Sequence, residues 1–391
     1  MTAIATQIDT AALRVSEFPM TDIWAYLNHA TFGPLPQRTV NALDEINRAF
    51  VVPHVRDAID HASPLCDARC GIARIAGGSA ERVAIVASAA HGISICASGI
   101  DWRDGDEVVI PHSEYPSLAI PFLAQAERGV HVRWAPKVAD NRTDLNAIEA
   151  AMTLRTRAVA ISHVEFADGY CNDLAALGAL CRDRGVLLIV DATQSLGAVP
   201  LDVDGWGVHA AVAHGYKWLH AGYGIGVAVF SAEGMERIQP THGGSASVCE
   251  NPFVQEPRLT WHPTAQRFEP GGQPLSLASG LRASLLLIEE VGHELILPHA
   301  LRLIDRLVDG VTARGYTITS SLEQPYRSPI VAFTSGSSDG DLRAHVALSE
   351  AGVVTAIRSR GIRVAPGFYN DASDIERLIE ALPESSVSHP G

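Results

Sequence analysis

The strongest constraint on the fold is a series of short apolar runs separated by longer amphipathic stretches. Seven of these runs predict strands: Val83–Ala87, Glu107–Ile110, His131–Trp134, Ala158–Ser162, Val186–Val190, Ala210–Ala213 and Ile225–Phe230. Helical patterns such as Leu174–Asp183 lie between several of them. Continuous apolar strands with intervening helices are typical of parallel sheets covered on both faces. The sequence therefore predicts an α/β fold with a mostly parallel seven-stranded sheet and helices on both faces.

The pattern changes after about residue 275. The elements expected there are two long helices, two strands and a last helix: Leu275–Val291, Leu301–Arg314, Pro329–Phe333, Arg360–Val364 and Ser373–Ala381. This mixture predicts a smaller α+β domain. We expect three parts: an N-terminal segment (1–45) that packs on the small domain, a large domain (46–270) and a small C-terminal domain (271–391).

Charge and cysteine usage narrow the range of partners. The 391 residues include 30 basic and 44 acidic side chains, a formal net charge of -14. Such a surface repels nucleic-acid phosphates and anionic lipid, so neither is an expected partner. The sequence shows no long uncharged apolar run and no basic segment leading into an apolar core at its start. Six scattered cysteines are typical of free thiols in a reducing cytoplasm.

Two ionisable residues follow neighbouring predicted strands. Asp191 comes directly after the run VLLIV, and Lys217 lies in HGYKWLHAGYGIG, just past HAAVA. Each alone has an ordinary explanation: a helix cap for Asp191, a solvated side chain for Lys217. The aromatic neighbours Tyr216 and Trp218 would lower the pKa of the lysine, as Schiff-base chemistry requires. Because ligands bind beyond the carboxyl ends of parallel strands, we expect the two residues to share a site.

Two further features fall at predicted strand ends. The turn Ser88–Ser94 (SAAHGIS) would expose backbone amides at a helix start, which suits a phosphate. Arg363, in GIRVAPGFYN, offers a guanidinium to a carboxylate, although an interdomain salt bridge is an alternative. Together with the aspartate and the lysine, they indicate a site for a phosphorylated group and a carboxylate ligand.

At this point the residues resemble a known family. The segment DATQSLGAVPLDVDGWGVHAAVAHGYKWLHAGYGIG resembles the class V aminotransferases of the fold-type I pyridoxal-5′-phosphate (PLP) enzymes. The likeness extends through RFEPGG and RSRGIRVAPGFYN, and YLNHATFGPLP is similar to the isopenicillin N epimerase-like branch. The resemblance covers roughly residues 24–380. It implies pyridoxal 5′-phosphate as cofactor, a small-molecule amino-acid substrate and a homodimer with shared active sites.

The resemblance also implies residue roles. Lys217 would form the internal aldimine and act as the base at Cα, and Asp191 would keep the cofactor's pyridine nitrogen protonated. Tyr115 would stack on the ring, and Gln194 would hydrogen-bond its phenolic oxygen. The phosphate contacts would come from Ala89, Ala90, His91, His214 and Tyr216, with Gly271 and Gly272 serving the other subunit. Asn28, His29 and Arg363 would bind the substrate.

The sequence departs from the family pattern in three places. Ala89 and Ala90 stand where many relatives have threonine at the first phosphate turn, and Gly272 stands where many have threonine at the cross-subunit position. Phe166 lies near a position that often holds asparagine. Glu165 then either faces the substrate or forms a salt bridge. No cysteine follows Cys249, whereas cysteine desulfurases of this family need one shortly before the carboxylate-binding arginine. Desulfuration through an enzyme persulfide is therefore not expected.

The expected function is that of an enzyme acting on an α-amino acid through a substrate Schiff base and Cα deprotonation. Transamination or C–S/β-elimination comes first, and epimerisation is the alternative. A catalytically silent binding module with this fold is an alternative of another class. A dinucleotide site is disfavoured because Gly222, Gly224 and Gly226 precede a strand rather than a helix. No metal site is expected, because the 16 histidines show no ligand spacing.

Overall fold

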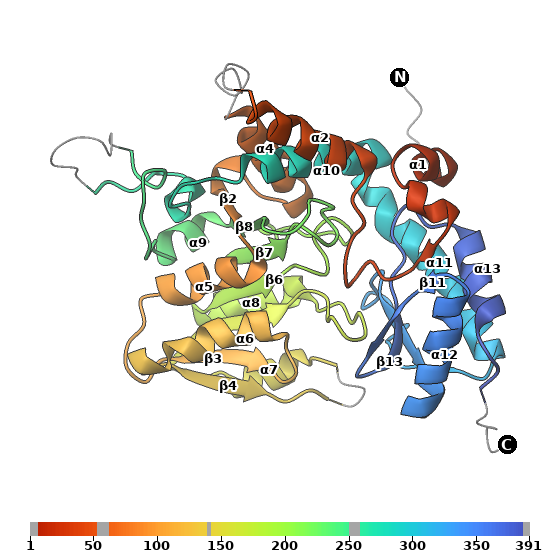
Figure 1. Cartoon of the computed structure of the whole chain (residues 1–391). Coiled ribbons are helices and arrows are strands. Elements are labelled where there is room, and N and C mark those ends of the chain that lie inside the picture. The colour runs from red at the N-terminus through yellow and green to blue at the C-terminus, as the bar shows by residue number, and fades with distance from the viewer. Residues whose placement is uncertain (1–6, 53–61, 139–141, 250–258, 386–391) are drawn as a thin grey trace.

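A central seven-stranded sheet organises the larger part of the computed structural model, which describes residues 7–52, 62–138, 142–249 and 259–385 (Figure 1). The strands are β2 (Val83–Val86), β3 (Glu107–Pro111), β4 (His131–Ala135), β5 (Thr156–Ser162), β6 (Leu187–Asp191), β7 (Ala210–His214) and β8 (Gly226–Phe230). Their order across the sheet is β2-β8-β7-β6-β5-β3-β4. All seven predicted strands are present, within two residues of the expected bounds.

Strand direction agrees with the prediction of a mostly parallel sheet. The pairs β3/β4, β3/β5, β5/β6 and β6/β7 are parallel, whereas β8 runs antiparallel to both β2 and β7. In register, Ser162 is the Cα partner of Asp191, and Asp191 is that of Val212. The carboxyl ends of β5, β6 and β7 therefore meet at one edge of the sheet.

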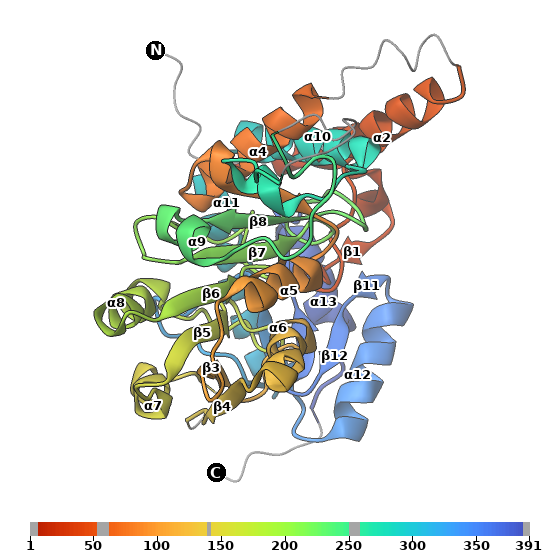
Figure 2. The same ribbon diagram turned by 90° about the vertical axis from the view of Figure 1, so that its left-hand side faces the viewer.

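Alternate side chains of the strands enter two separate cores. In β6, Leu188 and Val190 join one apolar cluster, while Leu187 and Ile189 join the other. The first cluster is covered by α4, α7, α8 and α10, and the second by α5 and α6. Figure 2 shows α7 and α8 on one side of the sheet and α5 and α6 on the other. This double cover confirms the predicted fold class and explains why the strands read as continuous apolar runs.

The helices around the sheet have the lengths expected for crossovers. They are α4 (Ser63–Ala76), α5 (Ala89–Gly99), α6 (Pro116–Leu123), α7 (Leu145–Ala151), α8 (Leu174–Arg184), α9 (Ala232–Arg237) and α10 (Leu275–Val291). Helix α5 lies very close to β7, because a Cβ added at Gly92 would be 2.5 Å from Val212 Cγ1. The glycine thereby lets the amino end of α5 approach the edge at which β6 and β7 end.

A second, antiparallel sheet lies beside the first (Figure 1), in the order β12-β13-β10-β9. Its strands are β9 (Thr317–Ile318), β10 (Val331–Thr334), β12 (Ala356–Arg358) and β13 (Gly361–Val364). Apolar residues of α11 (His293–Ala313), α12 (Ser338–Glu350) and α13 (Ala372–Ala381) form its core. Helix α11 begins eight residues before the predicted start. Pro298 lies inside this helix, where its missing N–H removes one helical hydrogen bond.

The N-terminal segment contacts both sheets. It contains α1 (Thr10–Ser16), β1 (Ala25–Tyr26) and α2 (Gln37–Ala49). Strand β1 pairs in parallel with β11 (Val353–Val354), next to the small sheet, whereas α2 packs on α10. The expected domain limits at residues 45 and 270 stay a prediction. Every described helix is too short or too polar to cross a lipid bilayer.

Candidate active site

Asp191 and Lys217 lie at the same edge of the large sheet. Asp191 is the last residue of β6, and Lys217 lies in the turn that follows β7, the neighbouring strand. Both are buried, with exposed fractions of 6% and 8%, and both line one cavity. The structure therefore brings together the two residues on which the sequence prediction depends.

The Asp191 carboxylate is available to a cationic ligand. Its Oδ1 accepts a hydrogen bond from the Thr193 backbone amide at 2.9 Å. Burial raises the pKa of Asp191, although the bonds from Thr193 and the charge of Lys217 act against that rise. Among the described residues it has no ion pair within 4 Å. A buried acid in this state favours a partner that presents a positive N–H group, such as a pyridinium.

Lys217 has the environment of a reactive amine. The chain contains two lysines, and the other one, Lys137, is held 3.0 Å from Glu165 in a buried ion pair. Burial lowers the pKa of Lys217 to about 8, with smaller contributions from neighbouring charges. Its Nζ lies 5.8 Å from the ring centre of Tyr115 and 5.9 Å from that of Tyr216. A larger neutral fraction at physiological pH is what Schiff-base formation requires.

The cavity includes most of the predicted cofactor residues and five that the sequence did not indicate. Seven predicted residues line it: Ala89, Tyr115, Asp191, Gln194, His214, Tyr216 and Lys217. The five additional ones are Ser117, Ser162, Val164, Phe166 and Thr193. Ser162 and Thr193 follow from a sequence signal, since one ends an apolar strand and the other lies two residues after Asp191. Phe166 follows from the resemblance, since it lies near a family position that often holds asparagine, whereas Val164 and Ser117 carry no such signal.

The amino end of α5 supplies hydrogen-bond donors at one end of this site. The Ser88 side chain caps the helix by accepting from the His91 backbone amide at 3.1 Å. His91 Nδ1 accepts from the Ala87 amide at 3.3 Å, so the proton of the neutral ring lies on Nε2. The Nδ1 of His214 is buried without a described hydrogen-bond partner, and burial lowers the pKa of this histidine to about 4. Neutral imidazoles and helix amides together suit a phosphate group.

Gln194 and His29 surround the lysine turn on the side away from the strands. Gln194 donates to the Ala30 carbonyl at 2.9 Å and accepts from Trp218 Nε1 at 3.1 Å, which leaves one amide hydrogen for a ligand. His29 is fully buried, lies 3.3 Å from the Lys217 carbonyl and stacks on Trp218. The expected aromatic flank is thus partly wrong: Trp218 faces His29, and Tyr115 takes its place beside the amine.

The predicted substrate residues lie behind the cavity lining. Arg363 lies on β13 and donates hydrogen bonds to the Phe166 carbonyl and the Thr31 hydroxyl. Asn28 accepts from the same hydroxyl at 2.6 Å. Neither Asn28, His29 nor Arg363 is among the residues that line the cavity. The interdomain salt bridge considered for Arg363 is not seen among the described residues.

Gly271, Gly272 and Glu165 are placed outside the cavity. The two glycines are exposed, with φ angles of 134° and 63°, and do not line the site within this chain. Their predicted role in the other subunit stays a prediction. Glu165 is buried and pairs with Lys137, which agrees with the salt-bridge alternative rather than a solvated or substrate-facing side chain.

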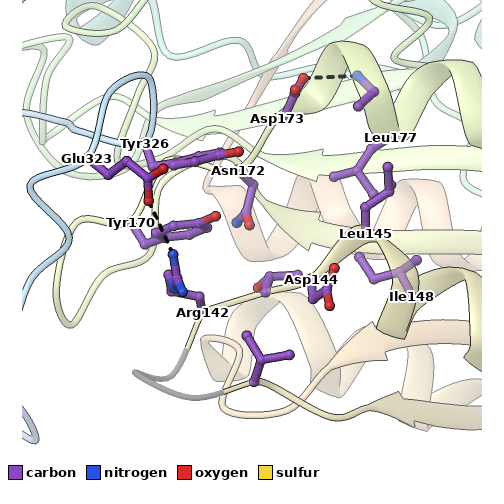
Figure 3. A pocket seen from close by; sticks show the side chains of 13 residues that line it. Arg142, Asp144, Leu145, Ile148, Tyr170, Asn172, Asp173, Leu177, Glu323 and Tyr326 are labelled. Carbon is purple, nitrogen blue, oxygen red and sulfur yellow. Dashed lines mark hydrogen bonds and ion pairs between the residues drawn. The ribbon is translucent and has the colours of Figure 1, made fainter.

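A second cavity lies beyond the carboxylate of Glu165. Figure 3 shows the ring of Tyr326 parallel to that of Tyr170, with the Arg142–Glu323 ion pair beside them. Asn172, which also lines this cavity, donates hydrogen bonds to Glu165 and to the Ser162 carbonyl. None of the residues predicted from the sequence to be functional lies there. The candidate active site is therefore the cavity that contains Asp191 and Lys217.

A lysine amine and a buried aspartate on adjacent strand ends, with helix amides and neutral imidazoles for a phosphate, define a fold-type I PLP site. The residues present fit this cofactor. The chain belongs to the Aminotransferase class-V family, whose model matches residues 25–378. Fold, family and cofactor thus agree with the predictions from sequence.

Relatives of this chain have more than one described activity. A probable cysteine desulfurase of Methanothermobacter thermautotrophicus is 27% identical over 94% of this chain and 96% of its own length. The uncharacterized aminotransferase YcbU of Bacillus subtilis is 25% identical over 82% and 83%. The cystine C-S lyase C-DES, solved with its product cysteine persulfide, superimposes with a TM-score of 0.84 at 23% identity over 93% and 98%. Because some of these relatives are named cysteine desulfurases, they do not confirm the prediction that this chain does not desulfurate through an enzyme persulfide.

Proposed function

We propose that this chain is a PLP-dependent enzyme that acts on α-amino acids by removing the Cα proton, as an aminotransferase or a C–S/β-eliminating lyase. The observation that carries the proposal is the buried amine of Lys217, which lies at the same edge of the sheet as Asp191. The other lysine is committed to an ion pair. A silent binding module would have no need to maintain a buried amine with a lowered pKa at the same sheet edge as a buried acid.

Each residue has a distinct task in this proposal. When bound, PLP supplies an electron sink for the pair left by Cα–H cleavage. The Lys217 amine would hold the cofactor and then take the proton from Cα, and its lowered pKa increases the fraction of free amine that can accept this proton. Asp191 would keep a proton on the cofactor's ring nitrogen, and Tyr115 would pack against the ring. Arg363 orients the substrate carboxylate with a planar guanidinium.

The cysteines favour elimination over an enzyme-persulfide route. No cysteine follows residue 249, and Cys171 is partly buried. Burial raises the pKa of its thiol to about 12, so it is not a thiolate nucleophile near neutral pH. Sulfur chemistry at this site would therefore release a sulfur product directly. Epimerisation is the remaining alternative, and it requires a second acid on the opposite face of the substrate.

In the proposed homodimer, each subunit would contribute residues to the phosphate end of the other subunit's site. Gly271 and Gly272 are exposed, and a Cβ at Gly272 would have no atom within 4 Å. We propose that they reach the phosphate of a second subunit in a homodimer. Sedimentation of the holoprotein measures its mass, and a monomer with full cofactor affinity would contradict this assignment.

The test of function is a spectral titration of the holoprotein with a panel of amino acids. Conversion to the pyridoxamine form identifies transamination, and release of a keto acid with ammonia or sulfide identifies elimination. Exchange of the Cα proton with solvent deuterium, without net conversion, identifies epimerisation. A protein that stays colourless with added PLP would overturn the proposal and favour the binding module.

A further inference from the structure

Two arginines of the small sheet converge on one neutral hydroxyl. Arg358 donates to Thr31 Oγ1 at 2.9 Å, and Arg363 donates to the same oxygen. Arg358 ends β12, where it pairs with Gly361, and Arg363 lies two residues beyond that glycine on β13. The two side chains are therefore diagonal neighbours on one face of the sheet.

Among the residues that the structure describes, neither guanidinium has an acidic partner. Within the described parts of the chain, the hydrogen bonds of Arg358 go to Thr31 and the Ile357 carbonyl, and those of Arg363 go to Thr31 and the Phe166 carbonyl. Arg363 Nε is buried without a partner, and the residue is 2% exposed. Burial, and then the charge of Arg358, lowers the pKa of Arg363 to about 9. Two close cations without a counter-ion favour anionic ligands.

The pair lies behind the cavity lining, close enough for its charges to act on the reactive amine. The charges of Arg363 and Arg358 both act on Lys217, and Phe166, whose carbonyl binds Arg363, lines the cavity. One carboxylate of an amino acid needs one planar guanidinium. The second guanidinium, at the more open end of the pair, then remains for another anionic group.

We propose that Arg358 binds a second carboxylate of the substrate, so that the enzyme selects amino acids that carry an acidic group away from the reacting centre. This inference rests on the proposed function, because it assigns the other carboxylate to Arg363. It names a substrate class: dicarboxylic amino acids, including disulfide-linked ones, in preference to neutral amino acids of equal length.

The test compares matched substrates on the holoprotein. Binding is followed by the spectral change with L-aspartate, L-glutamate and L-cystine, and with L-asparagine, L-glutamine and S-methyl-L-cysteine as neutral counterparts. At least one acidic substrate should bind roughly tenfold more tightly than its counterpart, the effect of one charge-assisted pair. Arg358→Gln should abolish that preference and leave neutral substrates within about twofold. Arg358→Lys should retain part of it.

Arg343→Gln is the control, because Arg343 is an exposed arginine of α12 outside the site. Two results would overturn the inference: equal affinity of the wild-type protein for acidic and neutral substrates, or equal losses for both in Arg358→Gln. The second result would make Arg358 a support for Thr31. If no amino acid of either set changed the spectrum, the proposed function itself would fail, which is a different outcome.

Discussion

Gly33 lies directly against the backbone of Lys217. A Cβ built on Gly33 would be 2.2 Å from the Lys217 carbonyl oxygen, and the Gly33 amide donates to the Tyr216 carbonyl at 2.9 Å. Two segments 184 residues apart in the sequence (33 to 217) are thus in contact at the turn that carries the reactive amine. The absence of a side chain at Gly33 is a condition for this contact.

Gly33→Ala should therefore displace either the N-terminal segment or the lysine turn. We expect a loss of about 1–3 kcal/mol in the free energy of unfolding, as for other overpacked sites. The affinity for PLP should fall as well, because the amine moves. Thermal unfolding and cofactor titration measure the two effects. Gly78→Ala is the control, since its new Cβ would meet a single side-chain atom at 3.2 Å. Unchanged cofactor affinity in Gly33→Ala would show that the contact does not position the lysine.

Reduction of the holoprotein with borohydride should label Lys217 alone. Reduction converts a Schiff base into a stable secondary amine, which a peptide map locates. Because the chain has only two lysines, Lys137 serves as an internal control. Its ammonium is paired with Glu165 and should stay unmodified. In Lys217→Ala the absorbance band of the bound cofactor should disappear. Label on Lys137 would contradict the assignment.

Asp191→Asn should keep the cofactor but slow the chemistry. The amide retains the shape of the side chain and loses the charge that holds a proton on the ring nitrogen. We expect turnover to fall by roughly a hundredfold or more, the range seen when a preorganised electrostatic partner is removed. Steady-state kinetics beside a cofactor titration separate the two effects. Asp183→Asn, on the exposed face of α8, is the control. A variant with normal turnover would remove this role from Asp191.

Glu114 should make the protein less stable as the pH rises from about 4.5 to about 8. Burial raises the pKa of Glu114 from 4.5 to about 8, and the nearby charge of Glu165 adds to the rise. Between these values the folded protein holds a proton that the unfolded chain has released, so unfolding is favoured by increasing pH. Below the lower value both states are protonated and the penalty is absent.

Glu114→Gln removes this titration while it preserves the hydrogen-bonding shape toward Ser162. Denaturant unfolding across pH 4.5–8 should show a shallower decline for the variant, with the difference reaching a few kcal/mol at the upper end. Parallel curves for variant and wild type would show that Glu114 titrates normally.

The large sheet was predictable because most of its strands are buried on both faces, whereas the edge strand β4 is largely exposed. Runs such as the one before Asp191 have no amphipathic pattern, and this places them in the sheet centre whatever surrounds them. The two-residue strand β1 has no such signal, since it forms only by pairing with Val353 and Val354. Its position depends on a contact between chain segments more than 300 residues apart.

The candidate site likewise contains residues that the sequence predicts and contacts that it does not. Asp191 and Lys217 were predictable because an ionisable side chain directly follows a buried strand. The hydrogen-bond partners of Arg363 were not predictable, because the neutral groups of Thr31 and Phe166 that it binds are remote in sequence. The orientation of Trp218 toward His29 likewise depends on where the N-terminal segment lies. Local sequence indicates which residues reach the sheet edge, and long-range packing decides what each of them meets.

The stretch from Ala25 to Gly33 joins the small sheet to the backbone of the lysine within nine residues. It pairs with β11, forms a bridge between Asn28 and Ala365, and ends on the Tyr216 carbonyl. A rigid rotation of the small sheet over the cavity would therefore be transmitted mechanically to the peptide that carries the amine. Substrate binding and proton transfer would then be coupled through the segment from Ala25 to Gly33.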